Sequence, residues 1–189
     1  NDGTAIPLVT VNEDWAALPN TPAYCWYNNS EAGYKDTYGA LYNWFVASTT
    51  NICPSGWHVP TDAEWEILMN YLIANGYNYD GTTSGNKVAK ALATGSGWTF
   101  SNVVGAVGNT DFPGKRNITG FSAPAGGYRY YVGGSFYNIG MIGIWWSSTG
   151  YSGYDGTMAF KRQLKYDNTD VNWSLTEKLG GCSIRCLRD

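Results

Sequence analysis

Charged side chains are scarce in this sequence. Asp, Glu, Lys and Arg together make up 14% of the 189 residues, against about a quarter in an average soluble protein. The formal net charge is −3, and no basic patch interleaved with aromatic residues is present, so we expect no nucleic-acid partner. No apolar run approaches the roughly 20 residues that cross a bilayer. We therefore expect no membrane insertion within this chain.

Recognisable catalytic motifs are also absent from the sequence. It contains one histidine, His58, and no GxSxG, HExxH or glycine-rich phosphate loop between a strand and a helix. A lone histidine is more often a hydrogen-bonded structural residue than a metal ligand or a base. Carboxylates could form a hydrolytic pair by meeting in space, but we expect Asp62 and Glu64 to serve a helix start. We therefore predict a protein that is not an enzyme, with no catalytic residue and no metal site.

The abundant residues are aromatic or small: the chain contains 15 Tyr, 9 Trp and 24 Gly. With so few charges, the surface must be built largely from Tyr, Asn, Ser, Thr and Gly, which hydrogen-bond and stack without strong charge. Antibody paratopes have a similar composition, because Tyr supplies contact area at a low entropy cost. The composition therefore favours a binding surface.

The four cysteines are Cys25, Cys53, Cys182 and Cys186. A zinc site with His58 is one interpretation, but the polar, tyrosine-rich composition is typical of extracytoplasmic proteins, in which disulfides form. We favour two disulfides, for which three pairings are available. The sequence begins without a signal-like segment, so we expect any export signal or lipid anchor to lie outside it.

The first third of the chain is predicted to be partly irregular. Residues 1–35 form a lead-in with one short strand near AYCWY, because prolines interrupt anything longer. In the next segment, apolar residues at helical spacing predict a short amphipathic helix that starts at Asp36 or Thr37. Its spacing pattern is formed by Leu41, Trp44, Phe45 and Ser48.

A second helix is predicted from its terminal signals. Thr61 followed by Glu64 is a capping box, in which each residue satisfies a backbone N–H of the other. The residues behind it place apolar side chains at helical spacing. We expect Asn75 and Gly76 to end this helix in a left-handed conformation.

The remaining sequence predicts short strands around a loop-rich middle. KVAKALA is a short helical piece, GGYRYYVGGSF and IGIWWSST predict strands, TMAFKRQLKYDNTDVNWSL predicts a hairpin, and CSIRCLRD predicts a final strand. Trp145 and Trp146 are neighbours in one of these strands, so they should face opposite sides. We predict a single α+β domain over residues 1–189, with two main helices, short antiparallel sheets and a long loop-rich region.

Several motifs occur together in a characteristic order: YGALYNWFVA, CPSGWHVPTDAEWEIL, KALATGSGW, GFSAPAGGYR, GGSFYNIG, WWSST and CSIRCLRD. From about Tyr38 to Asp189 the chain resembles the Fibrobacter succinogenes major paralogous domain family, so residues 36–189 would form the family core. The resemblance implies a C-type lectin-like fold. It also implies an extracellular or bacterial cell-surface location, often in lipoproteins of Fibrobacter and Bacteroidetes.

The resemblance also implies a disulfide pairing. The family pattern pairs Cys53 with Cys186, which leaves Cys25 to pair with Cys182. The calcium-binding motifs of sugar-binding C-type lectins are missing, so we expect no cofactor. Structural calcium in one of the acidic loops YDG, GNTD and YDNTD is the alternative.

Fold analogy directs the search for a site to aromatic and polar residues of the second half. The candidate ligand-binding residues are Tyr128, Arg129, Tyr130, Tyr131, Tyr137, Trp146, Tyr151, Tyr154, Asn172 and Trp173. Such side chains stack on sugars and satisfy hydroxyl groups without burying a charge. We therefore predict a non-catalytic binding module whose partner is a glycan or a surface protein. The alternative is a structural or assembly module of a larger surface protein, without a ligand pocket.

Overall fold

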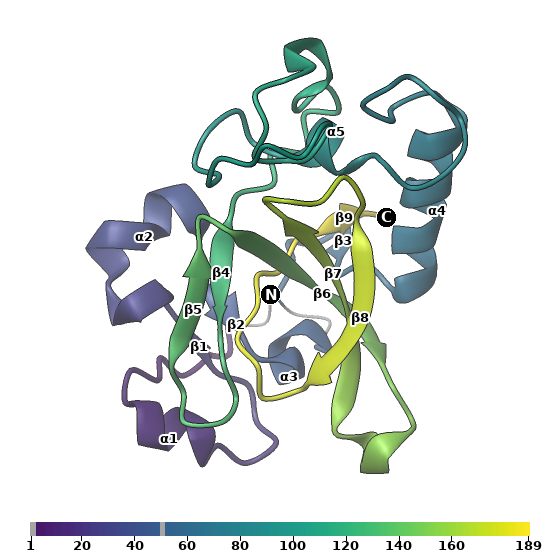
Figure 1. The fold of residues 1–189 in the computed structure, drawn as a ribbon. Helices are drawn as coiled ribbons and strands as arrows, with labels where there is room; N and C mark the ends of the chain where they lie inside the picture. Colours follow the sequence, from purple (N-terminus) through teal and green to yellow (C-terminus); the bar gives the residue numbers. More distant parts are fainter. Residues whose placement is uncertain (1–2, 50–51) are drawn as a thin grey trace.

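The computed structural model describes residues 3–49 and 52–189, so the first two residues of the predicted lead-in lie outside it. The chain has an α+β fold in which the helices are few and short (Figure 1). The helices are α1 (Asn12–Ala16), α2 (Glu31–Tyr38), α3 (Trp44–Ala47), α4 (Asp62–Ala74) and α5 (Ala89–Leu92), with 3-10 turns η1 (Tyr27–Asn29), η2 (Pro113–Lys115) and η3 (Tyr154–Gly156). The strands are β1 (Tyr24–Cys25), β2 (Leu41–Tyr42), β3 (Trp57–His58), β4 (Gly126–Arg129), β5 (Phe136–Ile139), β6 (Ile142–Gly150), β7 (Met158–Lys165), β8 (Asn172–Glu177) and β9 (Leu187–Arg188).

A five-stranded sheet in the order β5-β4-β6-β7-β8 forms the centre of the molecule. Strand β4 runs parallel to β6, whereas the other neighbours are antiparallel. The expectation of antiparallel sheets alone is therefore wrong. Strand β5, the hairpin partner of β4, pairs with one edge of β4. Strand β6 pairs with the other edge and runs in the same direction as β4. Two further sheets are two-stranded, β1 with β2 and β3 with β9.

Helix α4 begins with the predicted capping box. The Glu64 backbone N–H donates to Thr61 Oγ1 at 3.2 Å, and the Thr61 backbone N–H donates to Glu64 Oε2 at 2.8 Å. Gly76 has a φ of 73°, as expected for the left-handed residue after the helix. The buried side of α4 packs into a core cluster that also contains Trp145 and Leu164 of the sheet. Each fully buried apolar side chain there contributes about 1.5–3 kcal/mol.

The helix predicted from Asp36 or Thr37 onward is interrupted in the structure. Helix α2 ends before Gly39, which adopts φ 74° and ψ −172°, a conformation that side-chain-bearing residues rarely adopt. The next residues form β2, in which Tyr42 exchanges two backbone hydrogen bonds with Cys182 at 2.7 and 2.9 Å. Pairing with distant strands therefore overrides the local helical pattern, and only α3 follows it.

The two faces of the large sheet are covered by different core clusters. Trp145 belongs to the cluster under α4, whereas Trp146 belongs to the cluster around Cys53, Val59 and Cys182. The prediction that these neighbours face opposite sides is confirmed. Both side chains are buried, because the second face is covered as well as the first.

The described part of the lead-in packs onto the rest of the domain. Strand β1 pairs with β2, and the fully buried Trp15 donates from its indole nitrogen to the Leu179 carbonyl at 2.9 Å. A third core cluster forms here around Trp15, Ala23, Cys25, Tyr27 and Leu41. Residues 3–35 therefore contribute their own part of the core.

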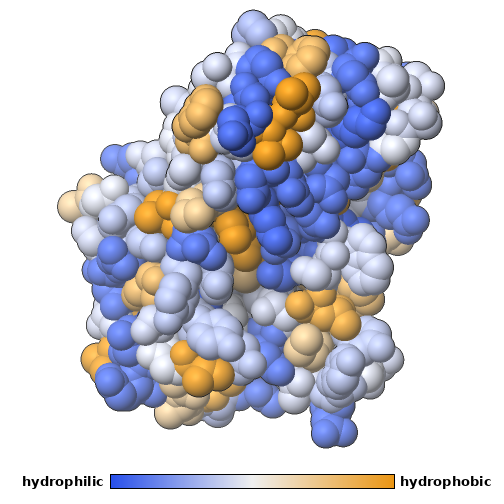
Figure 2. Space-filling view, viewed as in Figure 1, coloured by the Kyte–Doolittle hydropathy of each residue, from blue (hydrophilic) through white to orange (hydrophobic). Residues whose placement is uncertain are grey.

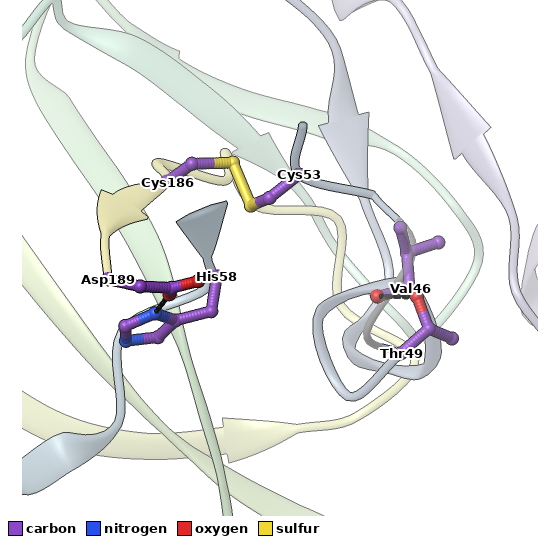
Figure 3. The surroundings of a disulfide bond; sticks show 6 residues. All are labelled: Val46, Thr49, Cys53, His58, Cys186 and Asp189. Atoms are coloured by element: carbon purple, nitrogen blue, oxygen red, sulfur yellow. Dashed lines mark hydrogen bonds and ion pairs between the residues drawn. A yellow bond between two sulfur atoms is a disulfide. The ribbon is translucent and has the colours of Figure 1, made fainter. Parts of the chain in front are cut away.

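A disulfide joins Cys53 to Cys186, with a Cα–Cα distance of 5.8 Å (Figure 3). It ties the segment before α4 to the end of the chain across 133 residues. Cys25 and Cys182 are free and buried, so the second predicted pairing is wrong. They pair with opposite edges of β2, which places them about two strand spacings, ~10 Å, apart, beyond the roughly 7 Å that a disulfide spans.

The loop-rich region lies between α5 and β4, at the top of Figure 1. The buried Lys90 organises it: its ammonium donates to the Asn109 carbonyl at 2.8 Å and forms an ion pair with Asp111. Arg116 donates to the Thr94 carbonyl at 3.1 Å. The long loops thus have an internal polar scaffold in place of regular structure.

No helix in the ranges 3–49 and 52–189 has the length and apolar character to span a membrane. On the face drawn in Figure 2, apolar residues form small separate groups among polar ones. A partner of this face would therefore meet mainly polar side chains.

Candidate ligand-binding surface

Four of the predicted residues form a tyrosine cluster on the β4–β5 hairpin: Tyr128, Tyr130, Tyr131 and Tyr137. Their ring centroids lie 4.7 Å apart for Tyr130 and Tyr131, 5.9 Å for Tyr128 and Tyr137, and 6.2 Å for Tyr130 and Tyr137. Tyr128 and Tyr137 are directly paired across the two strands, so their side chains share one face. Tyr130 and Tyr137 are 39% and 44% exposed, which leaves ring surface available to a ligand.

The turn that brings these rings together depends on glycine. Gly133 and Gly134 have φ values of 71° and 65°. A side chain at Gly134 would also place its Cβ 2.3 Å from the Asn12 carbonyl oxygen. The lead-in packs tightly against the hairpin at this point, so it helps to hold the tyrosine cluster in position.

A recess of about 140 Å³ lies beside the tyrosine cluster. It is lined by Tyr128, Arg129, Tyr130, Tyr131, Ile144, Lys161, Thr176, Gly180 and Cys182. Lys161 is directly opposite Trp146 in the β6–β7 ladder, so its side chain leaves the sheet on the face that carries Cys182. The recess therefore combines aromatic rings, hydroxyl groups and one ammonium group.

Lys161 has no acidic partner among the residues that the structure describes. Its ammonium donates one hydrogen bond, to Gln163 Oε1 at 3.2 Å. Burial is the largest effect on the pKa of Lys161 and lowers it. The Cys182 thiol raises this pKa, whereas the positive charge of the nearby Lys165 lowers it further. Burial raises the pKa of the Cys182 thiol to about 12. This neighbour is therefore uncharged at neutral pH and cannot compensate the ammonium.

A second aromatic group contains three predicted residues and Phe160. Tyr151 lies 6.0 Å from Tyr154 and 5.8 Å from Phe160, and Phe160 lies 6.0 Å from Trp173, measured between ring centroids. Tyr154 and Trp173 are among the most exposed aromatic residues described. Asn172 neighbours Trp173 in β8, so its side chain points to the opposite face. Seven of the ten predicted residues thus fall into two aromatic groups, and Asn172 belongs to neither.

Arg129 and Trp146 are corrections to the predicted site, because both are 0% exposed. The Arg129 guanidinium donates to the carbonyls of Gly134 and Val9 at 2.7 and 2.6 Å, and lies between the rings of Trp15 and Phe136. The Trp146 indole donates to the Tyr42 carbonyl at 2.7 Å. Their donors are used inside the fold, so neither side chain reaches a ligand at the surface.

Sequence reasoning missed Lys161 and a large pocket near the N-terminal segment. That pocket has a volume of about 720 Å³ and is lined by Thr4, Ala5, Ile6, Pro7, Thr21, Pro22, Tyr24, Tyr42, Val46, Thr49 and Ile52. The described residues that line it include no charged side chain, so it would suit an apolar group. We favour the tyrosine cluster despite the difference in size, because it brings together convergent polar groups with aromatic rings. Alternation of side chains along the predicted strands could have indicated that Lys161 lies on the same face as Trp146. No local pattern predicts that the three chain segments lining the large pocket come together.

Two of the three acidic loops considered for calcium use a carboxylate internally. Asp80 forms an ion pair with Lys87 at 2.5 Å, and Asp111 forms one with Lys90. Across the described ranges, no group of three or more His, Cys, Asp or Glu residues is arranged to hold a metal ion. Structural calcium stays a prediction, and the loop at Tyr166–Asp170 is the one without such a pair.

His58 is hydrogen-bonded, as predicted for a structural histidine. Its Nε2 lies 2.9 Å from Glu64 Oε1 and its Nδ1 lies 2.5 Å from Asp189 Oδ1 (Figure 3). Hydrogen bonds to Asp189 and Glu64 raise the pKa of His58. Glu64 therefore serves the start of α4 and the histidine at once.

One of the comparisons with known proteins identifies a family. A family model described as the Fibrobacter succinogenes major domain matches residues 1–188. The match includes the lead-in, which packs into the core as described above. Neither a curated protein nor a solved structure matches the chain. Since the family match covers almost the whole length, the chain belongs to the Fibrobacter succinogenes major domain family.

Proposed function

We propose that this chain is a non-catalytic binding module at a bacterial cell surface, and that it recognises a glycan through the tyrosine cluster. The carrying observation is the grouping of four tyrosine rings, two of them well exposed, beside a recess that contains polar groups. Ring faces stack on the C–H surfaces of sugars, and the hydroxyl groups hydrogen-bond with sugar hydroxyls. Tyrosine provides this contact at a low entropy cost.

One further feature, the disulfide, supports both the location and the fold assignment within this proposal. The Cys53–Cys186 disulfide fits an oxidising compartment outside the cytoplasm. The same bridge, between the segment before α4 and the last strand, supports a C-type lectin-like fold. A protein ligand remains compatible with the surface, because Tyr is enriched at protein interfaces as well.

The experiment is a glycan array probed with the wild-type protein and three tyrosine variants. We expect Tyr130→Ala and Tyr137→Ala to weaken binding about 10-fold or more, since aromatic anchors dominate recognition energy. Tyr71→Ala is the matched control, because Tyr71 is exposed on α4, away from the hairpin. Equal losses in all three variants would contradict the proposal. Silence of the wild type across plant, mucin and bacterial glycans would instead favour the structural or assembly module.

A further inference from the structure

The recess beside the tyrosine cluster contains a charge that no residue within 3–49 and 52–189 neutralises through an ion pair. An ammonium group has three donors, and Lys161 uses one of them, on Gln163 Oε1. Buried charges are normally paired, because removing them from water is costly. Lys90 illustrates the rule here, since its buried ammonium has Asp111 as its partner. Lys161 is only partly buried, but its ammonium lines the recess and forms no ion pair with any residue that the structure describes.

The other groups that face Lys161 do not supply the missing negative charge. The Cys182 thiol is neutral, Thr176 and Tyr128 bring hydroxyl groups, and Lys165 adds positive charge. Arg129 lines the recess, but its donors are directed at backbone carbonyls. The Glu177 carboxylate interacts electrostatically with Tyr131 at the rim of the recess. It forms no ion pair with Lys161. None of the described groups around the recess therefore forms an ion pair with the Lys161 ammonium.

The size of the recess limits what can enter it. Its volume of about 140 Å³ is below the roughly 300–1,000 Å³ of pockets that enclose a whole small molecule. It can take one functional group while the rest of the ligand lies on the neighbouring rings. A carboxylate fits this site, because it accepts charge-assisted hydrogen bonds from an ammonium and from hydroxyl groups.

We propose that the recess binds the carboxylate of an acidic sugar, with Lys161 as its charge partner and the tyrosine cluster as the stacking surface. This inference rests on the proposed glycan-binding function and specifies its ligand class. Lys161 is a specificity-determining residue in this arrangement. The rings provide contact to any sugar, and the ammonium selects those that carry a carboxylate.

The test uses oligosaccharides of galacturonic, glucuronic and sialic acid, each beside its methyl ester, which removes the charge and keeps the sugar. Binding is measured by calorimetry with the whole chain. We expect the acids to bind about 10- to 100-fold more tightly than the esters, the range for a hydrogen-bonded charge. Lys161→Gln should abolish this preference and leave ester binding within about 3-fold. Lys165→Gln removes a charge from the same strand that acts on Lys161 but does not line the recess, so most of the preference should remain.

The possible results separate the two proposals. Binding of acids and esters with equal affinity would overturn the carboxylate inference and leave the glycan-binding function standing. Equal losses in the Lys161 and Lys165 variants would also overturn it, because a general charge effect would then explain the preference. Absence of binding to every sugar would overturn both proposals. Poly-glutamate binding as tight as that of the acidic sugars would overturn the sugar assignment. Circular dichroism spectra of the variants, with Lys161→Met as a second substitution at this position, establish that a loss of binding does not come from misfolding.

Discussion

Lys90 and Lys161 both place an ammonium group inside the protein, but their surroundings differ. Lys90 is fully buried and contacts the Asn109 carbonyl and the Asp111 carboxylate, so it holds the long loops together. Lys161 lies in a recess open to ligands and has one neutral acceptor, Gln163. Lys90 thus belongs to a scaffold whose polar groups are hydrogen-bonded within the protein. Lys161 belongs to a surface on which donors are available to a ligand.

The largest effect on the scaffold is expected from loss of the disulfide. Because Cys53 and Cys186 close a loop of 133 residues, the chain-entropy relation predicts a loss of about 4–5 kcal/mol in the free energy of unfolding for the double alanine variant. Urea denaturation measures this loss. Dithiothreitol should destabilise the wild type and leave the double variant unchanged, since Cys25 and Cys182 are free. Further destabilisation of the variant by the reductant would show that these two cysteines are bridged.

The matched substitutions Lys90→Met and Lys161→Met test the comparison itself. Lys90→Met leaves the Asp111 carboxylate without its partner, and we expect a loss of about 3–5 kcal/mol in unfolding free energy. Lys161→Met removes a partly buried charge that has no ion pair among the described residues and keeps the apolar stem, so we expect a change within about 1 kcal/mol. Urea denaturation of both variants gives the two values. Similar losses would mean that Lys161 is as much part of the scaffold as Lys90.

The smallest effect is a pH dependence from His58 at the scaffold's edge. Hydrogen bonds to Asp189 and Glu64 raise its pKa in the folded state above the ordinary value of 6.5. Its stabilising contribution is therefore fully present below about pH 6.5, and is lost as the pH rises through the folded pKa. We expect a small fall in melting temperature as the pH rises above about 6.5. His58→Gln should flatten this slope, and an unchanged slope would place its origin in another group.

The elements predicted well are those whose signals lie within a few residues. The capping box of Thr61 and Glu64 and the glycine at Gly76 set the ends of α4, because each acts on its own turn of the helix. The helix predicted around Leu41 failed for the opposite reason. Its apolar spacing was local, but the hydrogen bonds between Tyr42 and Cys182 come from the other end of the chain.

The candidate site was predictable in part. The tyrosine cluster follows from the hairpin GGYRYYVGGSF, since strand pairing brings Tyr128 and Tyr137 to one face. The burial of Arg129 could not be read from this segment. Its guanidinium is enclosed by Trp15 and by carbonyls of the lead-in, more than a hundred residues away.

The sequence by itself determined the α+β class, the start and end of α4, and the aromatic, weakly charged composition of the surface. Capping, periodicity and composition act over short distances, so they can be read from neighbouring residues. Long-range packing keeps Cys25 and Cys182 apart, covers Trp146, and leaves Lys161 without an acidic partner in the described part of the chain. Each of these depends on which distant strands meet, and the desolvation of a buried group is set by all the segments packed around it.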